Sequence, residues 1–315
     1  MNNDFIRSAF QDHYGYLWFA THGGGLLRFD PDKSSMLSFI YSEKDPGSIS
    51  NNIVLSILED KEGVLWIGTF GAGVDKYDNR KNHIENIKIS NISRNGIWQN
   101  TVTALSIGTG NRLWIGSEGG GIGYYEHDSE KVKYLMLNPE QEKDLLSNII
   151  YAILEYKPGR LLLGTWGAGL YDLDVRSGSS KHYEFSEDPT GNLSKSRIVS
   201  LLRDRSGDIW VGAWGDGVSL LRQNKKEIIS YVNNRSDPGS LSSNNIHFLY
   251  ETLYGEIWIG TEKGLNKFQK DTGTFTKYVN DPGNPDTLSN DKVITIYEDG
   301  SQTLWIGTDH GLNRY

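Results

Sequence analysis

The stretch DKEGVLWIGTFGAGVDKYD at residues 60–78 contains the pattern on which the fold prediction depends. An acidic residue and a glycine precede the apolar run around Trp66, and a glycine-rich turn leads into a second run that ends at Tyr77 and Asp78. Short apolar or alternating runs that are bounded by turn-forming residues are typical of β-strands. This stretch therefore predicts two short strands joined by a tight turn.

The same pattern recurs along the whole chain, with the tryptophan that follows Leu or Ile as its anchor. The seven anchor positions are Trp18, Trp66, Trp114, Leu162, Trp210, Trp258 and Trp305. Successive anchors lie 48 residues apart, except for a last interval of 47. Similarity at a fixed period is the signature of a repeat architecture. We therefore expect seven copies of one structural unit.

Each unit is predicted to contain four antiparallel strands, because a further apolar run precedes the quoted stretch and a more clearly alternating run follows it. Residues 53–60 and 274–279 are examples of these two runs. Four-stranded units repeated around an axis form a β-propeller, whereas an open solenoid would need capping segments that the sequence does not show. The fold prediction is thus an all-β, seven-bladed β-propeller of four-stranded antiparallel blades.

The propeller is expected to be a single domain at residues 1–315. Its repeats lie at approximately 4–51, 52–99, 100–147, 148–195, 196–243, 244–290 and 291–315. The last repeat stops after its third run, so we expect the last blade to lack its outer strand. We also expect that the chain is a fragment of a longer protein.

Two residues of the LWIGT-like run have predicted packing roles. The tryptophan is expected to fill the space between adjacent blades, where a large flat side chain buries the most surface. The glycine two positions later is expected to let neighbouring chains approach closely. These glycines are Gly68, Gly116, Gly164, Gly212, Gly260 and Gly307.

Composition and charge exclude several classes of function. The 315 residues include no cysteine, which excludes disulfides, thiolate metal sites and cysteine nucleophiles. The formal net charge of -8 argues against nucleic acid and anionic membranes as partners. It also disfavours strongly anionic ligands, unless a local basic pocket overrides it. The first residues, MNNDFIRSAF, do not resemble a signal peptide, and no apolar run is long enough to span a membrane.

The repeat resembles the two-component regulator propeller repeat, which is carried here by residues 60–69 and 71–78. The linker DPGSLSSNNI at residues 237–246 is also similar to that family, with related versions that start at Asp45, Asp188 and Asp281. In that family such propellers form the periplasmic sensing region of hybrid histidine kinases, typically from Bacteroidetes, that control glycan-use genes. The resemblance implies a ligand-sensing propeller in the periplasm, as part of a membrane-anchored sensor. The chain shows no kinase or hydrolase motif, so we expect no enzyme activity.

Seven residues, each directly after a LWIGT-like strand, are expected to form a ring on one face of the propeller. They are His22, Phe70, Glu118, Trp166, Trp214, Glu262 and Asp309. Their chemistry varies while the flanking residues are monotonous, which indicates that packing does not constrain them. Trp166 and Trp214 could stack on sugar rings, and Trp98 in an irregular linker is a further candidate. The alternative left open is that both ring tryptophans lie flat over the adjacent glycine turns.

The predicted ligand is a small oligosaccharide, with no cofactor and no metal. A second propeller or a neighbouring domain of the full sensor, and a homodimer, are kept as candidate partners. One alternative function is a propeller lyase that resembles streptogramin lyase, for which His22, Glu118, Glu262 and His310 supply the residue types. Another is a protein-docking platform, for which an exposed apolar patch is expected.

Overall fold

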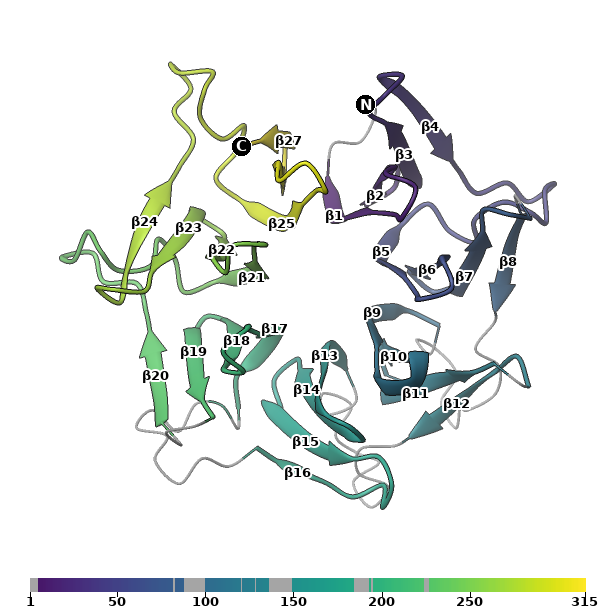
Figure 1. The fold of residues 1–315 in the computed structure, drawn as a ribbon, viewed down its shortest axis with the longest axis horizontal. Helices are drawn as coiled ribbons and strands as arrows, with labels where there is room; N and C mark the ends of the chain where they lie inside the picture. The colour runs from purple at the N-terminus through teal and green to yellow at the C-terminus, as the bar shows by residue number, and fades with distance from the viewer. Residues whose placement is uncertain are drawn as a thin grey trace.

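The computed structural model describes residues 5–81, 83–87, 100–119, 121–127, 129–135, 149–183, 193, 195–223 and 227–315. Within these residues the strands form seven antiparallel sheets, six of four strands and one of three. The sheets are arranged as blades around a central axis, and the two ends of the chain lie in adjacent blades (Figure 1). The predicted seven-bladed propeller is therefore confirmed, including its three-stranded last blade.

The strands of the first four blades follow in chain order. Blade 1 contains β1 (Ile6–Gln11), β2 (Leu17–Thr21), β3 (Leu26–Asp30) and β4 (Ser35–Phe39). Blade 2 contains β5 (Val54–Glu59), β6 (Val64–Thr69), β7 (Gly73–Asp78) and β8 (His83–Ile87). Blade 3 contains β9 (Val102–Ile107), the 3-10 helix η1 (Thr109–Asn111), β10 (Leu113–Ser117), β11 (Gly121–Glu126) and β12 (Lys131–Leu135). Blade 4 contains β13 (Ile150–Lys157), β14 (Arg160–Thr165), β15 (Leu170–Asp174) and β16 (Ser180–His182).

The remaining three blades complete the ring. Blade 5 contains β17 (Arg197–Arg203), β18 (Ile209–Trp214), β19 (Gly217–Arg222) and β20 (Glu227–Tyr231). Blade 6 contains β21 (Ile246–Glu251), β22 (Ile257–Thr261), β23 (Gly264–Gln269) and β24 (Thr274–Tyr278). Blade 7 contains β25 (Val293–Glu298), β26 (Leu304–Thr308) and β27 (Gly311–Arg314). The first strand of every blade is innermost (Figure 1), and β25 contacts β1, which closes the ring.

Neighbouring blades approach most closely at the glycine of the second strand. A methyl group on this glycine would lie 2.7 to 2.9 Å from the first buried residue of the next inner strand at Gly68, Gly116, Gly164, Gly212 and Gly260. At the ring closure, the corresponding distance from Gly307 to Ile6 is 3.2 Å. This first buried residue is a Val or Ile in all seven blades. The predicted role of these glycines is confirmed.

The anchor tryptophans lie between blades, as predicted. The Trp66 ring packs on Tyr125 of blade 3 with ring centroids 4.7 Å apart, and Trp210 packs on Phe268 of blade 6 at 5.0 Å. The polar edge of the indole is satisfied locally, because Trp66 Nε1–H donates to Asp60 Oδ2 at 2.8 Å. The same bond joins Trp18 to Asp12, Trp210 to Asp204 and Trp305 to Asp299.

The acidic residue at the end of an inner strand links that blade to the preceding one. Glu59 at the end of β5 accepts the backbone N–H of His13 from blade 1 at 3.0 Å. Equivalent bonds join Thr109 to Glu155 at 2.7 Å and Arg205 to Glu251 at 3.1 Å. At the ring closure, Gln11 takes the place of the acidic residue at the end of inner strand β1. Its Oε1 accepts the backbone N–H of Gly300 in blade 7 at 2.7 Å. Each such bond holds the turn of one blade against the inner strand of the next.

One linker is held by a buried carboxyl group. Asp75 in β7 is fully buried, and it accepts hydrogen bonds from the backbone N–H of Ser50 and from Asn86 Nδ2, both at 2.8 Å. Burial raises the pKa of Asp75, although these hydrogen bonds oppose the rise. In blade 6 the equivalent residue is Asn266, which accepts the N–H of Ser242 at 2.9 Å. The amide of Asn266 thus accepts the equivalent hydrogen bond from the linker without carrying a charge.

Replacement of Gly212 by alanine tests the contact between blades. The added methyl group would lie 2.8 Å from Ile246 Cγ2. We expect Gly212→Ala to lower the free energy of unfolding by roughly 1–3 kcal/mol, as overpacking of a core does. Urea unfolding followed by tryptophan fluorescence measures this change.

Gly283→Ala is the matched control, because its added methyl group would meet only Asp281 Oδ1 at 3.4 Å. We expect it to change the free energy of unfolding by less than about 0.5 kcal/mol. Equal stability of the Gly212→Ala variant and the parent chain would contradict the close approach.

Replacement of Asp75 by asparagine tests the buried carboxyl group. Since the pKa of Asp75 is raised in the folded chain, the parent protein is stabilised below that pKa and loses this stability as the pH rises through it. The neutral amide would mimic the protonated carboxyl group, so we expect Asp75→Asn to be more stable than the parent at neutral pH by roughly 1–2 kcal/mol. The difference should shrink towards acidic pH, as measured by urea unfolding over a pH series.

The exposed Asp271 provides the control, because Asp271→Asn changes charge without removing a buried carboxyl group. An Asp75→Asn variant that is less stable than the parent at neutral pH would show that the charged form is the preferred one.

Candidate ligand-binding site

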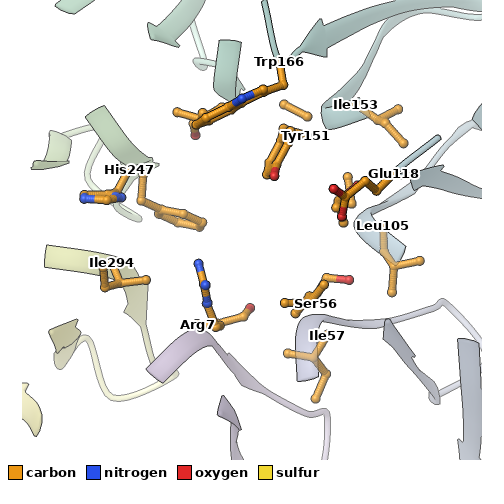
Figure 2. A pocket seen from close by; sticks show the side chains of 18 of the residues that line it. Arg7, Ser56, Ile57, Leu105, Glu118, Tyr151, Ile153, Trp166, His247 and Ile294 are labelled. Carbon is orange, nitrogen blue, oxygen red and sulfur yellow. The ribbon is translucent and has the colours of Figure 1, made fainter. Parts of the chain in front are cut away.

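A cavity of about 620 Å³ lies at the centre of the ring, where residues of all seven blades meet. This volume is in the range of small-molecule sites in proteins. The cavity wall includes the turns between the second and third strands, and it continues along the inner strands. Figure 2 shows its side chains, which come from different blades and face a shared space.

Each inner strand carries a one-residue β-bulge next to this cavity. In blade 1, Ile6 pairs with Thr21 and Ser8 pairs with Ala20, so Arg7 has no partner in the ladder. The same shift occurs directly after the first buried residue in all seven blades. A bulge redirects a side chain out of the regular alternation. The seven bulged residues all line the cavity: Arg7, Leu55, Thr103, Tyr151, Val199, His247 and Ile294.

The ring predicted from the sequence surrounds the same cavity. Five of its members, His22, Phe70, Glu118, Trp166 and Trp214, belong to the cavity wall. Backbone hydrogen bonds keep these residues beside the cavity. For example, the N–H of Glu118 donates to the carbonyl oxygen of Thr101, which directly precedes β9, at a distance of 2.9 Å. A role in ligand binding remains a prediction for these residues.

The other predicted residues lie elsewhere. Glu262 and Asp309 are not among the residues that line the cavity, but each forms an ion pair with a residue that does, Glu262 with His247 and Asp309 with Lys292. His310 is 72% exposed and lies beside Asp309. Trp98 lies outside the described residues.

Aromatic side chains form an arc along one side of the cavity, from blade 4 to blade 6. The ring centroids of Tyr151 and Trp166 are 5.1 Å apart, and those of Trp166 and Trp214 are 6.4 Å apart. His247 continues the arc, with its ring edge-on to Trp214 at 5.0 Å. Arg197 lies over the Trp166 ring at 5.1 Å. Both tryptophans thus contact other side chains and also face the cavity.

Two cations lie on the side of blades 1 and 7. The Arg7 guanidinium lies over the Phe5 ring at 4.7 Å, and Lys292 Nζ approaches the same ring at 5.6 Å. Burial lowers the pKa of Arg7, while Tyr151 and Asp309 act in the opposite direction. Figure 2 shows the Arg7 side chain pointing into the cavity, with Tyr151 and Trp166 across from it.

His247 and Glu262 form a hydrogen-bonded pair at the cavity wall. His247 Nε2 lies 2.8 Å from Glu262 Oε2. Burial lowers the pKa of His247, and Lys292 and Arg7 add to this effect, while Glu262 opposes it. The imidazole is therefore neutral at neutral pH, and its Nε2–H donates to the carboxylate. Glu262 also lies 4.0 Å from Lys292, which in turn lies 3.7 Å from Asp309.

Sequence reasoning missed the bulged residues and the cation Lys292. A signal for the bulged residues exists, since each directly follows the first buried Val or Ile of an inner strand. That position reads Arg, Leu, Thr, Tyr, Val, His and Ile around the ring, while the preceding residue is always Val or Ile. The residues that follow the LWIGT-like runs, from His22 to Asp309, were identified because their chemistry varies while their neighbours are constant. The bulged residues show the same pattern.

The described residues give no support for a metal centre or a membrane segment. They contain no group of three or more His, Asp or Glu side chains that could hold a metal ion. None of the helical segments in this part of the chain is long and apolar enough to cross a membrane.

Comparisons with known proteins agree on the repeat and on the fold. The family model described as two component regulator propeller matches residues 1–23, 47–71, 192–215 and 287–310. Each matched segment contains an inner strand and the second strand of the same blade. No curated protein matches the sequence.

Solved structures with the same fold include two extracellular domains from B. thetaiotaomicron. The domain of the system BT3049, described as a hybrid two component system, has a TM-score of 0.79 and 24% identity and matches 99% of this chain. The domain of BT4673 has a TM-score of 0.76 and 21% identity and also matches 99%. The chain spans only 40% and 38% of the lengths of these two domains.

A lyase also has this fold. Virginiamycin B lyase from Staphylococcus aureus has a TM-score of 0.72 and 13% identity, and the match covers 98% of this chain and 93% of the lyase. Sequence identities this low establish the fold alone. The relation to a repeat family therefore depends on the four segments that match the family model. The chain is thus a seven-bladed propeller, and four of its segments match the two component regulator propeller model.

Proposed function

We propose that this propeller is part of the extracytoplasmic sensor region of a hybrid two-component system and binds a small oligosaccharide in its central cavity. The repeat family and the two extracellular domains with the same fold support the sensor role. In a Gram-negative cell this region would lie in the periplasm. Ligand binding would act by shifting a conformational or dimer equilibrium of the full sensor.

The aromatic arc is the observation on which the choice of ligand depends. Tyr151, Trp166 and Trp214 present a nearly continuous series of rings to the cavity. The apolar faces of sugar rings pack on such surfaces, while their hydroxyl groups need hydrogen-bonding partners. Glu118 and Arg7 belong to the same cavity wall and provide both acceptors and donors.

Thermal unfolding in the presence of oligosaccharides tests this proposal. A sugar at about 100 times its dissociation constant stabilises the native state by ~2.7 kcal/mol, which raises the melting temperature measurably. We expect at least one sugar of a panel of glycan-derived oligosaccharides to produce this rise. The rise should disappear in Trp166→Ala and in Trp214→Ala.

Tyr254→Ala is the matched control, because Tyr254 is 72% exposed and lies in the turn between β21 and β22, outside the cavity wall. This variant should keep the full response to the sugar. A panel in which no sugar changes the melting temperature would contradict the proposal and would favour a protein-docking platform.

The His247–Glu262 pair favours lyase chemistry as a second candidate function. A neutral imidazole whose Nε2–H donates to a carboxylate can accept a proton at Nδ1. Incubation with a streptogramin B lactone and Mg²⁺ distinguishes the two functions. Metal-dependent opening of the lactone that is lost in His247→Asn would establish the lyase, whereas a sensor gives no turnover.

A further inference from the structure

The geometry points to an acidic saccharide as the ligand: we propose that Arg7 pairs with a carboxylate or sulfate group on a sugar that packs against the aromatic arc. This inference rests on the proposed sugar-binding function and specifies the class of sugar. The shared chemistry is an anionic group with two or more oxygens on one centre. The experiment below separates carboxylate from sulfate.

Arg7 is placed for ligand contact rather than for structure. It is the bulged residue of β1, so its side chain leaves the ladder and points into the cavity (Figure 2). Among the described residues it contacts the Phe5 ring but forms no hydrogen bond or ion pair. A guanidinium has five N–H donors in a fixed planar fork. These donors therefore face the cavity and are available to a ligand.

The surroundings of Arg7 favour an anion at this position. Burial disfavours the charged form of Arg7, and Tyr151 and Asp309 oppose this effect. Lys292 lies on the same side of the cavity wall, but it already forms ion pairs with Asp309 and Glu262. An incoming carboxylate or sulfate would supply the missing counter-charge, and a guanidinium can bind two of its oxygens at once.

The charge of the cavity wall differs from that of the whole chain. The chain has a formal net charge of -8, but the described wall holds two permanent cations, Arg7 and Lys292, and one carboxylate, Glu118. Glu118 lies in blade 3, where burial and then the Glu118 charge raise the pKa of Tyr151. His247 is neutral, since its pKa is lowered. On the side of blades 1 and 7, Lys292 is paired with Asp309 and Glu262, so Arg7 is the cation of the described wall that has no carboxylate partner.

Arg7 and the aromatic arc lie on opposite sides of the cavity, and another cation, Arg197, lies over the Trp166 ring. In Figure 2 Arg7 faces Trp166 and Tyr151 across the open space. A sugar ring that packs on the arc would direct a substituent towards Arg7. A neutral hydroxyl group in that place would offer one uncharged acceptor oxygen, so its hydrogen bonds to the guanidinium would be weaker. The arrangement thus selects for an acidic group over a neutral one.

Calorimetric titration of the 315-residue chain with matched pairs of sugars tests this inference. One pair is trigalacturonate and its methyl ester, and the other is a sulfated galactose disaccharide and its unsulfated form. We expect the acidic member of at least one pair to bind about 10- to 100-fold more tightly, the range for hydrogen bonds to charged groups. The pair that shows the preference identifies the anionic group.

Arg7→Gln should reduce the affinity for the acidic sugar to that of its neutral partner. It should leave the thermal stability of the unliganded chain unchanged, because no described hydrogen bond is lost. Arg176→Gln is the control, since Arg176 is exposed in the turn between β15 and β16. This variant should keep the full preference.

The outcomes separate this inference from the proposed function. Equal affinity for acidic and neutral sugars, or an acidic preference that persists in Arg7→Gln, would overturn the inference and leave sugar sensing in place. If only the neutral sugars bind, the inference about an acidic ligand is likewise overturned, and the proposed sugar-sensing function is kept. If neither acidic nor neutral sugars bind, both the inference and the proposed function fail.

Discussion

The whole structure depends on the close approach between the second strand of one blade and the inner strand of the next. In six blades a glycine in the second strand allows this approach, whereas blade 1 has Ala20 there, and the first buried Val or Ile of the next inner strand fills the space above it. The bulge follows directly after this Val or Ile, so the contact also sets the height at which a side chain turns into the cavity. Packing between blades and the geometry of the site therefore have one origin.

The repeat made most of the fold predictable, because most blades use the same residues at the positions that pack against the neighbouring blades. Trp66 and Gly68 recur at a fixed spacing, and their roles follow from size alone. The site was only partly predictable. The ring of residues from His22 to Asp309 could be predicted because each of them directly follows an LWIGT-like run. The bulge that turns Arg7 and His247 towards the cavity does not change the pattern of apolar residues, so it could not be predicted from that pattern. Glu262 pairs with His247 on another strand of the same blade, and spacing along the chain does not reveal that partner.

Departures from the repeat show which interactions can be exchanged. Blade 4 lacks the anchor tryptophan and has Leu162 instead, and it also lacks the aspartate that would accept the indole N–H, since Tyr156 occupies that position. Blade 3 keeps Trp114 but has Gly108 in place of the aspartate. There the carboxylate of Glu155 from the next blade occupies the space, close to where a side chain on Gly108 would lie. A carboxylate is thus kept next to the indole, although it comes from a different blade.

The same exchangeability explains how a binding site can arise in a structural repeat. Residues that hold the blades together vary little from blade to blade, because each packs against a neighbouring blade. The bulged residues and the ring of residues from His22 to Asp309 lie at or beside the cavity, so each blade can contribute a different side chain at two positions. The aromatic residues of blades 4 to 6 and Arg7 of blade 1 thus make the wall of the cavity asymmetric within a symmetric scaffold.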